Sequence, residues 1–432
     1  MANSTNVLGN NITRKLMRTF LDGYEASRVL TKTVNTQLLT GKFNPSSGTT
    51  VDFKRPHDYK TDRTADGDIS STDKSDIVAA KATGTVQDYF TVHADWNEVD
   101  EALKLDQLDL ILKPMAERMI TDLELDFGSY MSTNCNLHVG TPGTAIDAWG
   151  DVAAAGALMD SIGVPKEGKR CYVMNPYVSI ALANTQSGLA SGDNSMVTTA
   201  WQNAQITSKF GNLNAMSSNA LSSYTSGTLS AGANRAGAVT SSVPDQTYAT
   251  NKDTMIQSIS VDGFGSGSDT IKAGEIVQVT GVNRLGLSTR SAFIDGSGAQ
   301  VLWSGVVTAD VTLSSGAGTL LVAGPAIVEA NGQYNTVDTA IVENDVITII
   351  NPAASTVYQP AMFYHEQAFG IGSVPLKKLY STDTIATTLD GFQIRCSKYA
   401  DGDANKQKIR FDLLPAYATF NPMFAGQGFG IA

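Results

Sequence analysis

Apolar residues recur most regularly between Pro114 and Met131, at intervals of three and four. That spacing gathers them on one face of a helix, while the acidic residues of the stretch mostly point elsewhere. The apolar members are Met115, Met119, Leu123, Phe127, Tyr130 and Met131. Pro114 favours a first helical turn, where its missing N–H needs no partner. The pattern predicts a helix that begins at Pro114, rises about 27 Å and needs cover from distant segments.

A second helical pattern lies in residues 1–41, with apolar positions on one side and basic ones on the other. The apolar positions are Ile12, Leu16, Phe20, Leu21 and Tyr24, and the basic ones are Arg14, Lys15 and Arg18. From Arg14 to Lys32, five basic residues face two acids, within a chain of net charge -11. This contrast suggests an acidic partner, and a solvated helix face explains it equally well.

From Thr49 the pattern becomes extended: Val51 and Phe53 alternate with polar residues, and a second run from Val86 to Val92 is also typical of a strand. Residues 55–76 between them hold six Asp and four Lys or Arg. Two strands with such a charged tip would project as an arm whose backbone edges could pair with a neighbour. The alternative is a disordered surface loop.

The next stretch predicts an Ala-rich helix from Asp147 to Ile162, anchored by Trp149. The following G-x-x-x-x-G-K spacing, 163–169, imitates a phosphate-binding loop, but Arg170 replaces the Ser or Thr that binds magnesium. A helix precedes it and a strand follows, which reverses the usual context, so nucleotide binding is rejected. Further short elements are expected, in order, at 171–174 (strand), 177–183 (helix), 199–206 (helix) and 210–216 (strand).

Residues 222–350 differ in composition, with 16 of the 39 glycines, five basic residues and eleven acids. Short alternating strands separated by turn residues favour an inserted β domain, either a small barrel or a sandwich. The expected strands are 255–261, 275–280, 301–308, 320–322 and 346–350, and 225–251 is expected to be a flexible loop. The C-terminal part returns to mixed structure with residues 363–371.

A hairpin is expected from Phe392 to Phe420, because apolar and polar residues alternate on both of its sides. Its apolar face is a natural cover for the helix that starts at Pro114. This pairing would join distant segments into one domain.

Composition is ordinary for a soluble protein, and 432 residues suggest roughly three domains. No stretch approaches the length of an apolar membrane span, and no charged leader precedes an apolar run at the start, so a cytoplasmic product is expected. The three cysteines are widely spaced and lack a C-x-x-C pair, which argues against disulfides and zinc. Net negative charge argues against gripping nucleic acid over most of the surface, but not against enclosing it.

Candidate chemistry is sparse. The four histidines are scattered, and neither H-E-x-x-H nor G-x-S-x-G occurs, so no enzyme, cofactor or metal is predicted. Asp401, Asp403, Asn405 and Asp412 imitate a calcium loop, but Lys406 stands where the turn demands Gly and the flanks are strands. A hairpin turn is the favoured interpretation.

The segment KYADGDANKQKIRFDLLPAYATFNP, from Lys398 to Pro422, closely resembles the coat proteins of short-tailed, double-stranded DNA bacteriophages that carry an inserted β domain. Other matching pieces follow in the same order along the chain. They are FKRPHDY at 53, ADGDIS at 65, KATGTV at 81, EALKLDQLDLILKP at 101, TDLE at 121, TAWQNAQI at 199 and GSVPLKKLYS at 372. The resemblance covers the chain except most of 222–350.

This resemblance implies an α+β fold of the Hong Kong 97 type, with a long spine helix, an extended β-hairpin loop and an inserted, barrel-like all-β domain. The implied domains are an N-terminal arm (1–45), the extended loop (46–93), a peripheral domain (94–140 and 375–432), an axial domain (141–221 and 351–374) and the inserted domain (222–350).

The implied function is a major capsid protein that assembles with a scaffolding protein into an icosahedral precursor shell, which expands as double-stranded DNA is packaged. Implied partners are further copies in hexamers and pentamers, the scaffolding protein and a portal protein, with assembly in the bacterial cytoplasm. Arg14, Lys15 and Arg18 are candidates for interior or scaffolding contacts. The candidates for contacts between subunits are Arg55, Lys60, Arg63, Asp66 and Asp68. The alternative is a β-rich phage tail or adhesion protein that binds a host surface glycan through 222–350.

Overall fold

The structure is a computed structural model that describes residues 17–18, 20–22, 28–36, 48–72, 74–97, 108–187, 206, 208–265, 267–380, 383–388, 390–401 and 406–431. The chain forms two compact units, each built from segments that are distant in sequence. Unit 1 comprises 1–52, 84–127 and 369–418, and unit 2 comprises 53–83, 128–368 and 419–432.

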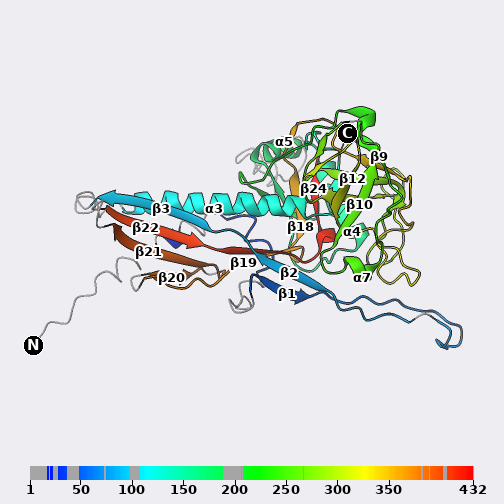
Figure 1. The fold of residues 1–432 in the computed structure, drawn as a ribbon, viewed down its shortest axis with the longest axis horizontal. Coiled ribbons are helices and arrows are strands. Elements are labelled where there is room, and N and C mark those ends of the chain that lie inside the picture. The colour runs from blue at the N-terminus through cyan, green and yellow to red at the C-terminus, as the bar shows by residue number, and fades with distance from the viewer. Residues whose placement is uncertain are drawn as a thin grey trace, which may run out of the picture. The chain divides into compact units, whose positions relative to one another are not determined.

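The longest helix, α3, runs from Leu108 to Thr133 (Figure 1). The prediction that Pro114 starts the helix is wrong, because Pro114 lies inside it, on an exposed face. At this seventh helical position Pro114 cannot donate a backbone hydrogen bond, and packing of the buried apolar stripe outweighs that local cost. The apolar stripe is confirmed: Met115, Met119, Leu123, Phe127 and Met131 are buried. Tyr130 is half-buried.

An antiparallel four-stranded sheet, in the order β20-β21-β22-β3, forms part of unit 1. Its strands are β3 (Phe90–Asn97), β20 (Thr384–Thr387), β21 (Gln393–Asp401) and β22 (Lys406–Leu413). The expected hairpin is β21 paired with β22, and its alternating apolar residues are fully buried. Phe20 stacks on Phe411 of this face with ring centroids 4.1 Å apart. Tyr417 of the following strand meets the helix, 5.1 Å from Phe127 between ring centroids.

A second four-stranded sheet has the order β1-β2-β23-β19. Its strands are β1 (Thr50–Lys54), β2 (Lys81–Val86), β23 (Pro415–Thr419) and β19 (Phe369–Ser373). The single run expected from Val86 to Val92 is therefore the end of β2 and the beginning of β3, which belong to different sheets. Residues 55–80 between β1 and β2, named the arm below, continue the two strands as adjacent extended segments (Figure 1).

Unit 2 contains a six-stranded mixed sheet in the order β4-β24-β18-β5-β7-β6. Its strands are β4 (Leu137–Val139), β5 (Arg170–Met174), β6 (Lys209–Phe210), β7 (Leu213–Ser217), β18 (Ala361–His365) and β24 (Ala425–Gly428). Two helices, α4 (Trp149–Ile162) and α5 (Pro176–Ser187), accompany it. Trp149 is 58% exposed, so the prediction that it anchors α4 is wrong; Val152, Met159 and Ile162 do so. Nearly all of the helix expected at 199–206 lies outside the described residues.

The inserted region forms a closed barrel in the order β10-β15-β13-β12-β16-β9. Its strands are β9 (Ala236–Val239), β10 (Ile256–Asp262), β12 (Ile276–Asn283), β13 (Leu302–Val307), β15 (Gly318–Ala323) and β16 (Val346–Ile349). The five strands expected from alternation are confirmed. Their inward residues form one core around Trp303.

The flexible loop expected at 225–251 is wrong, because β9 pairs with β10 and β16 and so closes the barrel. Small residues are required in this strand: a Cβ at Gly237 would lie 2.6 Å from the ring of Phe264. Composition alone therefore suggested a loop where close packing demanded glycine and alanine. The remaining short elements are β8 (Tyr224–Thr225), β11 (Thr270–Ile271), β14 (Val311–Thr312), β17 (Val357–Tyr358), α7 (Tyr248–Asn251), η4 (Gly232–Arg235) and η5 (Pro422–Phe424).

Candidate functional site

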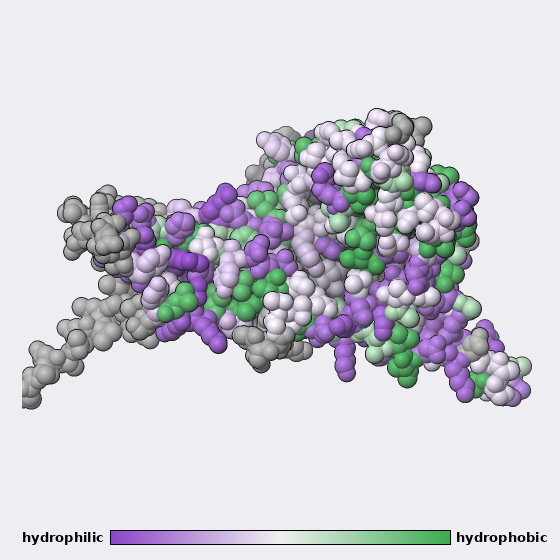
Figure 2. Space-filling view, viewed as in Figure 1, coloured by the Kyte–Doolittle hydropathy of each residue, from purple (hydrophilic) through white to green (hydrophobic). Residues whose placement is uncertain are grey.

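The tip of the arm carries exposed charge of both signs. Arg63, Asp66 and Asp68 are exposed and Lys60 is half-buried, and Figure 2 shows hydrophilic side chains along the arm. Asp66 accepts a hydrogen bond from the N–H of Asp68, and Asp68 accepts one from the N–H of Ser70, so short local turns shape the tip. The Ser70 N–H holds the pKa of Asp68 below its usual range. The tip therefore presents ionised groups to whatever it meets.

Arg55, the fifth candidate on the arm, faces its own chain. Its guanidinium donates to the carbonyls of Lys81, Asp253, Thr419 and Phe420. Burial among these groups lowers the Arg55 pKa to about 10, although the nearby Asp253 carboxylate opposes the shift. The arm is thus fixed where it leaves β1.

The base of the arm lies against the loops of the barrel. The side-chain amide of Gln333 donates to the carbonyls of Asp58 and Asp76 and accepts from the Asp76 N–H, so it joins both sides of the arm. Arg290 forms an ion pair with the Asp58 carboxylate. Sequence reasoning missed Gln333 and Arg290, since neither belongs to a motif and both lie more than 200 residues from the arm.

The basic helix near the N-terminus is only partly described. Arg14 and Lys15 lie outside the described residues. Arg18 is exposed in a helical segment whose neighbours Met17 and Phe20 are buried. This arrangement agrees with one apolar and one basic side.

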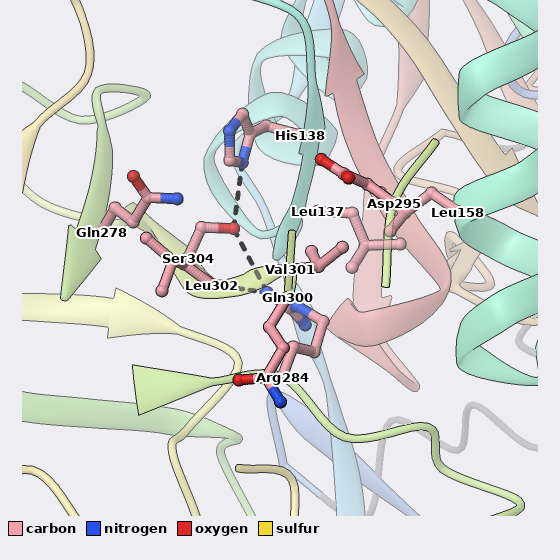
Figure 3. A pocket seen from close by; sticks show the side chains of 10 residues that line it. All are labelled: Leu137, His138, Leu158, Gln278, Arg284, Asp295, Gln300, Val301, Leu302 and Ser304. Atoms are coloured by element: carbon pink, nitrogen blue, oxygen red, sulfur yellow. Dashed lines mark hydrogen bonds between the residues drawn. The ribbon is translucent and has the colours of Figure 1, made fainter. Parts of the chain in front are cut away.

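A pocket of about 240 Å³ lies in unit 2 at the barrel and β4 (Figure 3). Ser304 sits between His138 and Arg284 and is hydrogen-bonded to both, at 3.0 Å from His138 Nδ1 and 3.2 Å from Arg284 Nη2. Asn136 accepts from Arg284 and donates to the carbonyls of Ser304, Ala323 and Gly324. These contacts, named the polar rivet below, join β4 to the barrel.

Burial in the polar rivet lowers the pKa of both of its basic side chains, but only His138 is neutral at pH 7. Burial lowers the pKa of His138 to about 4, and the positive charge of Arg284 contributes in the same direction. Burial also lowers the pKa of Arg284 to about 10. A neutral imidazole that is hydrogen-bonded to a serine and lies beside a buried cation supports structure, since the cation disfavours the proton that an acid–base catalyst would have to carry.

Other candidate chemistry finds little support in the described residues. The side chain of Asp401 and residues 402–405 lie outside them, and with them most of the calcium-like loop. Asp412 is buried and paired with Arg395 and Arg410. Within the described ranges, no cluster of three His, Cys, Asp or Glu residues could hold a metal ion. Among the helices described, none is long and apolar enough to cross a membrane.

Two comparisons with known sequences cover almost the whole chain. Residues 1–430 match the family described as P22 coat protein, gene protein 5. The major capsid protein of Acyrthosiphon pisum secondary endosymbiont phage 1 is 41% identical over 428 residues, which cover 98% of this chain and 99% of that protein.

Two phage structures are among the solved structures that are similar to this chain, each at low sequence identity. The capsid of the cyanophage P-SCSP1u has a TM-score of 0.43 and 11% identity, with 93% of this chain and 86% of that chain covered. A Mycobacterium phage Che8 structure has a TM-score of 0.43 and 12% identity, with 93% and 94% covered.

The family assignment rests on the two sequence matches, because they span the arm, the long helix and the barrel together. The long helix, the arm continuing two strands, and the closed barrel are features that the Hong Kong 97-type fold with an inserted domain leads one to expect. A tail or adhesion protein, the alternative expectation, does not fit this family. The chain therefore belongs to the P22 coat protein family and is a phage major capsid protein.

Proposed function

We propose that this capsid protein assembles with a scaffolding protein into an icosahedral precursor shell in the host cytoplasm, and that the shell expands when double-stranded DNA is packaged. Its copies form hexamers and pentamers, and a portal protein joins the shell. No enzymatic step is required of the chain. A subunit held by several weak contacts gains from multivalency, so that misplaced subunits dissociate while complete shells persist.

The observation that carries the proposal is the exposed, charged tip of the arm. Between β1 and β2 the structure assigns no strand to the described residues of the arm, and Arg63, Asp66 and Asp68 are exposed. An arm with free backbone edges and charges of both signs suits contact with a second copy of the chain. Lys60, Arg63, Asp66 and Asp68 are therefore proposed to contact the neighbouring subunit, while Arg55 fixes the arm to its own subunit.

The basic residues near the N-terminus suit the scaffolding partner. Arg18 is exposed, and Arg14 and Lys15 belong to the same predicted basic face. In a chain of net charge -11, this region would attract an acidic segment of another protein and leave most of the wall repelling DNA. The domain limits expected from the sequence are proposed with it: 1–45, 46–93, 94–140 with 375–432, 141–221 with 351–374, and 222–350.

Charge reversal at the tip tests the proposal. In Lys60→Glu/Arg63→Glu, neighbouring carboxylates lose their positive partners, so the yield of closed shells seen by negative-stain electron microscopy should fall at least about tenfold. Urea unfolding of the unassembled subunit should change little, because Arg63 is exposed and Lys60 is only half-buried. Shells formed by this variant at the normal yield would contradict the proposal.

A charge-balanced variant separates specific contacts from net charge. Adding Asp66→Lys/Asp68→Lys to the first two substitutions restores the net charge but inverts the charge of each of these four residues. If only net charge governs assembly, shells return. If the tip recognises defined partners, they do not.

Expansion is proposed to move the arm and the N-terminal segment while α3 stays rigid. Hydrogen exchange in precursor and expanded shells tests this. Protection should change in 55–80 and remain constant in α3. A change centred on Pro114–Met131 would refute it.

A further inference from the structure

The barrel contacts the arm mainly through the backbone of the arm. Gln333 bonds the carbonyls of Asp58 and Asp76 and the N–H of Asp76, the last two at 2.9 Å. Asn331 donates to the carbonyl of Lys74 at 3.3 Å. These bonds depend on where the two segments of the arm run and not on which side chains the arm carries.

A second set of contacts lies closer to β2. Lys252 donates to the carbonyl of Ala79 at 2.8 Å, and Asp253 accepts from the N–H of Lys81 at 3.0 Å. Tyr248 and Tyr334 stack with ring centroids 3.8 Å apart. Val78 and Ala80 pack on these rings and on Ile327. The arm is thus held by polar and apolar contacts together.

Contact with the barrel stops before the tip. The described contacts of the barrel with the arm reach Asp58 on one side and Lys74 on the other. Between them, the hydrogen bonds of the described residues are local to the arm, such as the Lys60 N–H to Ser75 Oγ at 3.1 Å. A segment fixed at its base and free at its tip has its direction set by the base.

We propose that Gln333 and Arg290 are positioning residues, through which the inserted barrel sets the direction of the arm and so presents its tip to the neighbouring subunit. The side-chain amide of Gln333 fixes the spacing of the two segments, because one group bonds both. The Arg290–Asp58 ion pair fixes their orientation against the barrel. This role rests on the proposed function of the tip as a contact between subunits.

The contacts of Gln333 and Arg290 with the arm are named the clamp below. Hydrogen exchange of the full-length, unassembled subunit tests whether the clamp holds the arm. In Gln333→Ala, the Asp76 N–H loses its acceptor, so its exchange should accelerate at least about tenfold. Amides of the barrel core, such as Ile276, which donates to Asn351, should exchange as before. Lys272→Gln is the matched control, because it breaks an exposed ion pair with Asp310 on the same barrel without touching the arm.

A charge swap keeps the test informative if Gln333→Ala fails to fold. Arg290→Asp alone should accelerate exchange in the arm and reduce the yield of shells severalfold. Arg290→Asp combined with Asp58→Arg should restore both towards the original values, since the ion pair is rebuilt with its partners exchanged. A double variant no better than the single one would count against a positioning role for the pair.

The outcomes separate this proposal from the proposed function. If hydrogen exchange in the arm of Gln333→Ala is unchanged, Gln333 does not hold the arm, whatever the yield of shells. Faster exchange with a normal rate and yield of assembly would overturn the positioning role. Normal assembly after charge reversal at the tip would instead overturn the proposed function and leave the clamp in place.

Discussion

Single residues in the polar rivet show how strongly backbone geometry and a buried amide depend on each other. Gly324 has φ +80°, and its missing side chain leaves room for the amide of Asn136. A Cβ at this position would lie 2.0 Å from Asn136 Nδ2. Asn136 could then no longer donate to the carbonyls of Ser304 and Ala323.

Gly324→Ala should therefore lower the free energy of unfolding by about 3 kcal/mol or more, through backbone strain and lost buried hydrogen bonds. Gly281→Ala is the control: its φ is +83°, and nothing lies within 4 Å of the place that the new methyl group would take. It should cost about 1 kcal/mol, from strain alone. Urea unfolding of the subunit measures both. Equal losses would show that Asn136 contributes little.

The His138 imidazole predicts a pH dependence. Its pKa of about 4 lies below the value near 6.5 of an unfolded chain, so the unfolded state binds more protons between these limits. Stability is full above about pH 6.5 and decreases as the pH falls towards about 4. Because the residue is only half-buried, the loss from pH 7 to pH 5 should be about 1 kcal/mol, below the full linkage value of about 2 kcal/mol. Urea unfolding at both pH values should show this difference shrink in His138→Gln.

The same residues show what the sequence leaves undetermined. The four histidines are predicted to be structural or on the surface, and no spacing connects His138 with Ser304, which lies 166 positions away. Likewise the charges of Arg55 and Arg63 look alike in sequence, yet one is enclosed by carbonyls of its own chain and the other is exposed. Local patterns carry no information about which distant carbonyls will surround a side chain.

At the scale of elements, α3 anchors the segment that precedes the arm. The Glu124 carboxylate is buried and accepts from the N–H groups of Leu30 and Thr31, at 2.6 and 2.9 Å, and from the Thr31 hydroxyl at 2.6 Å. Arg28 extends the contact through an ion pair with Asp390. One acidic residue on the helix thus holds a segment that lies 93 and 94 positions earlier in the chain.

Glu124→Ala would leave two backbone N–H groups without an acceptor, at a cost of about 2–3 kcal/mol. The segment 28–36 should detach before the helix unfolds, so trypsin should cleave after Lys32 markedly faster. Glu117→Ala, on an exposed face of the same helix, should change neither quantity. Similar cleavage of both variants would contradict this account.

Elements with clear periodicity are predicted well from the sequence, and those without it are not. Alternation locates five strands of the barrel and the hairpin of β21 and β22 because each has one buried face. It misses β9, whose Ala and Gly residues look like a loop, and it gives α3 a start at Pro114 because a proline favours that position. Both errors arise where packing outweighs local preference.

At the scale of the whole molecule, the electrostatic attraction proposed for the tip would act against the general repulsion of an acidic chain. Salt screens both, since the Debye length falls from about 10 Å at 0.1 M to about 3 Å at 1 M. The difference in shell yield between the original protein and Lys60→Glu/Arg63→Glu should therefore be largest at low salt and shrink as salt rises. Static light scattering during assembly over a salt series measures it. A difference independent of salt would indicate that shape, and not charge, governs the contact.

The clamp on the arm has a practical consequence for variation. The barrel holds backbone carbonyls of the arm through Gln333, Asn331 and Lys252. Every amino acid supplies such a carbonyl, so the barrel does not constrain most side chains nearer the tip of the arm. The arm is therefore suited to peptide insertion. A foreign sequence could replace its outer turn while the barrel residues that hold its base stay unchanged.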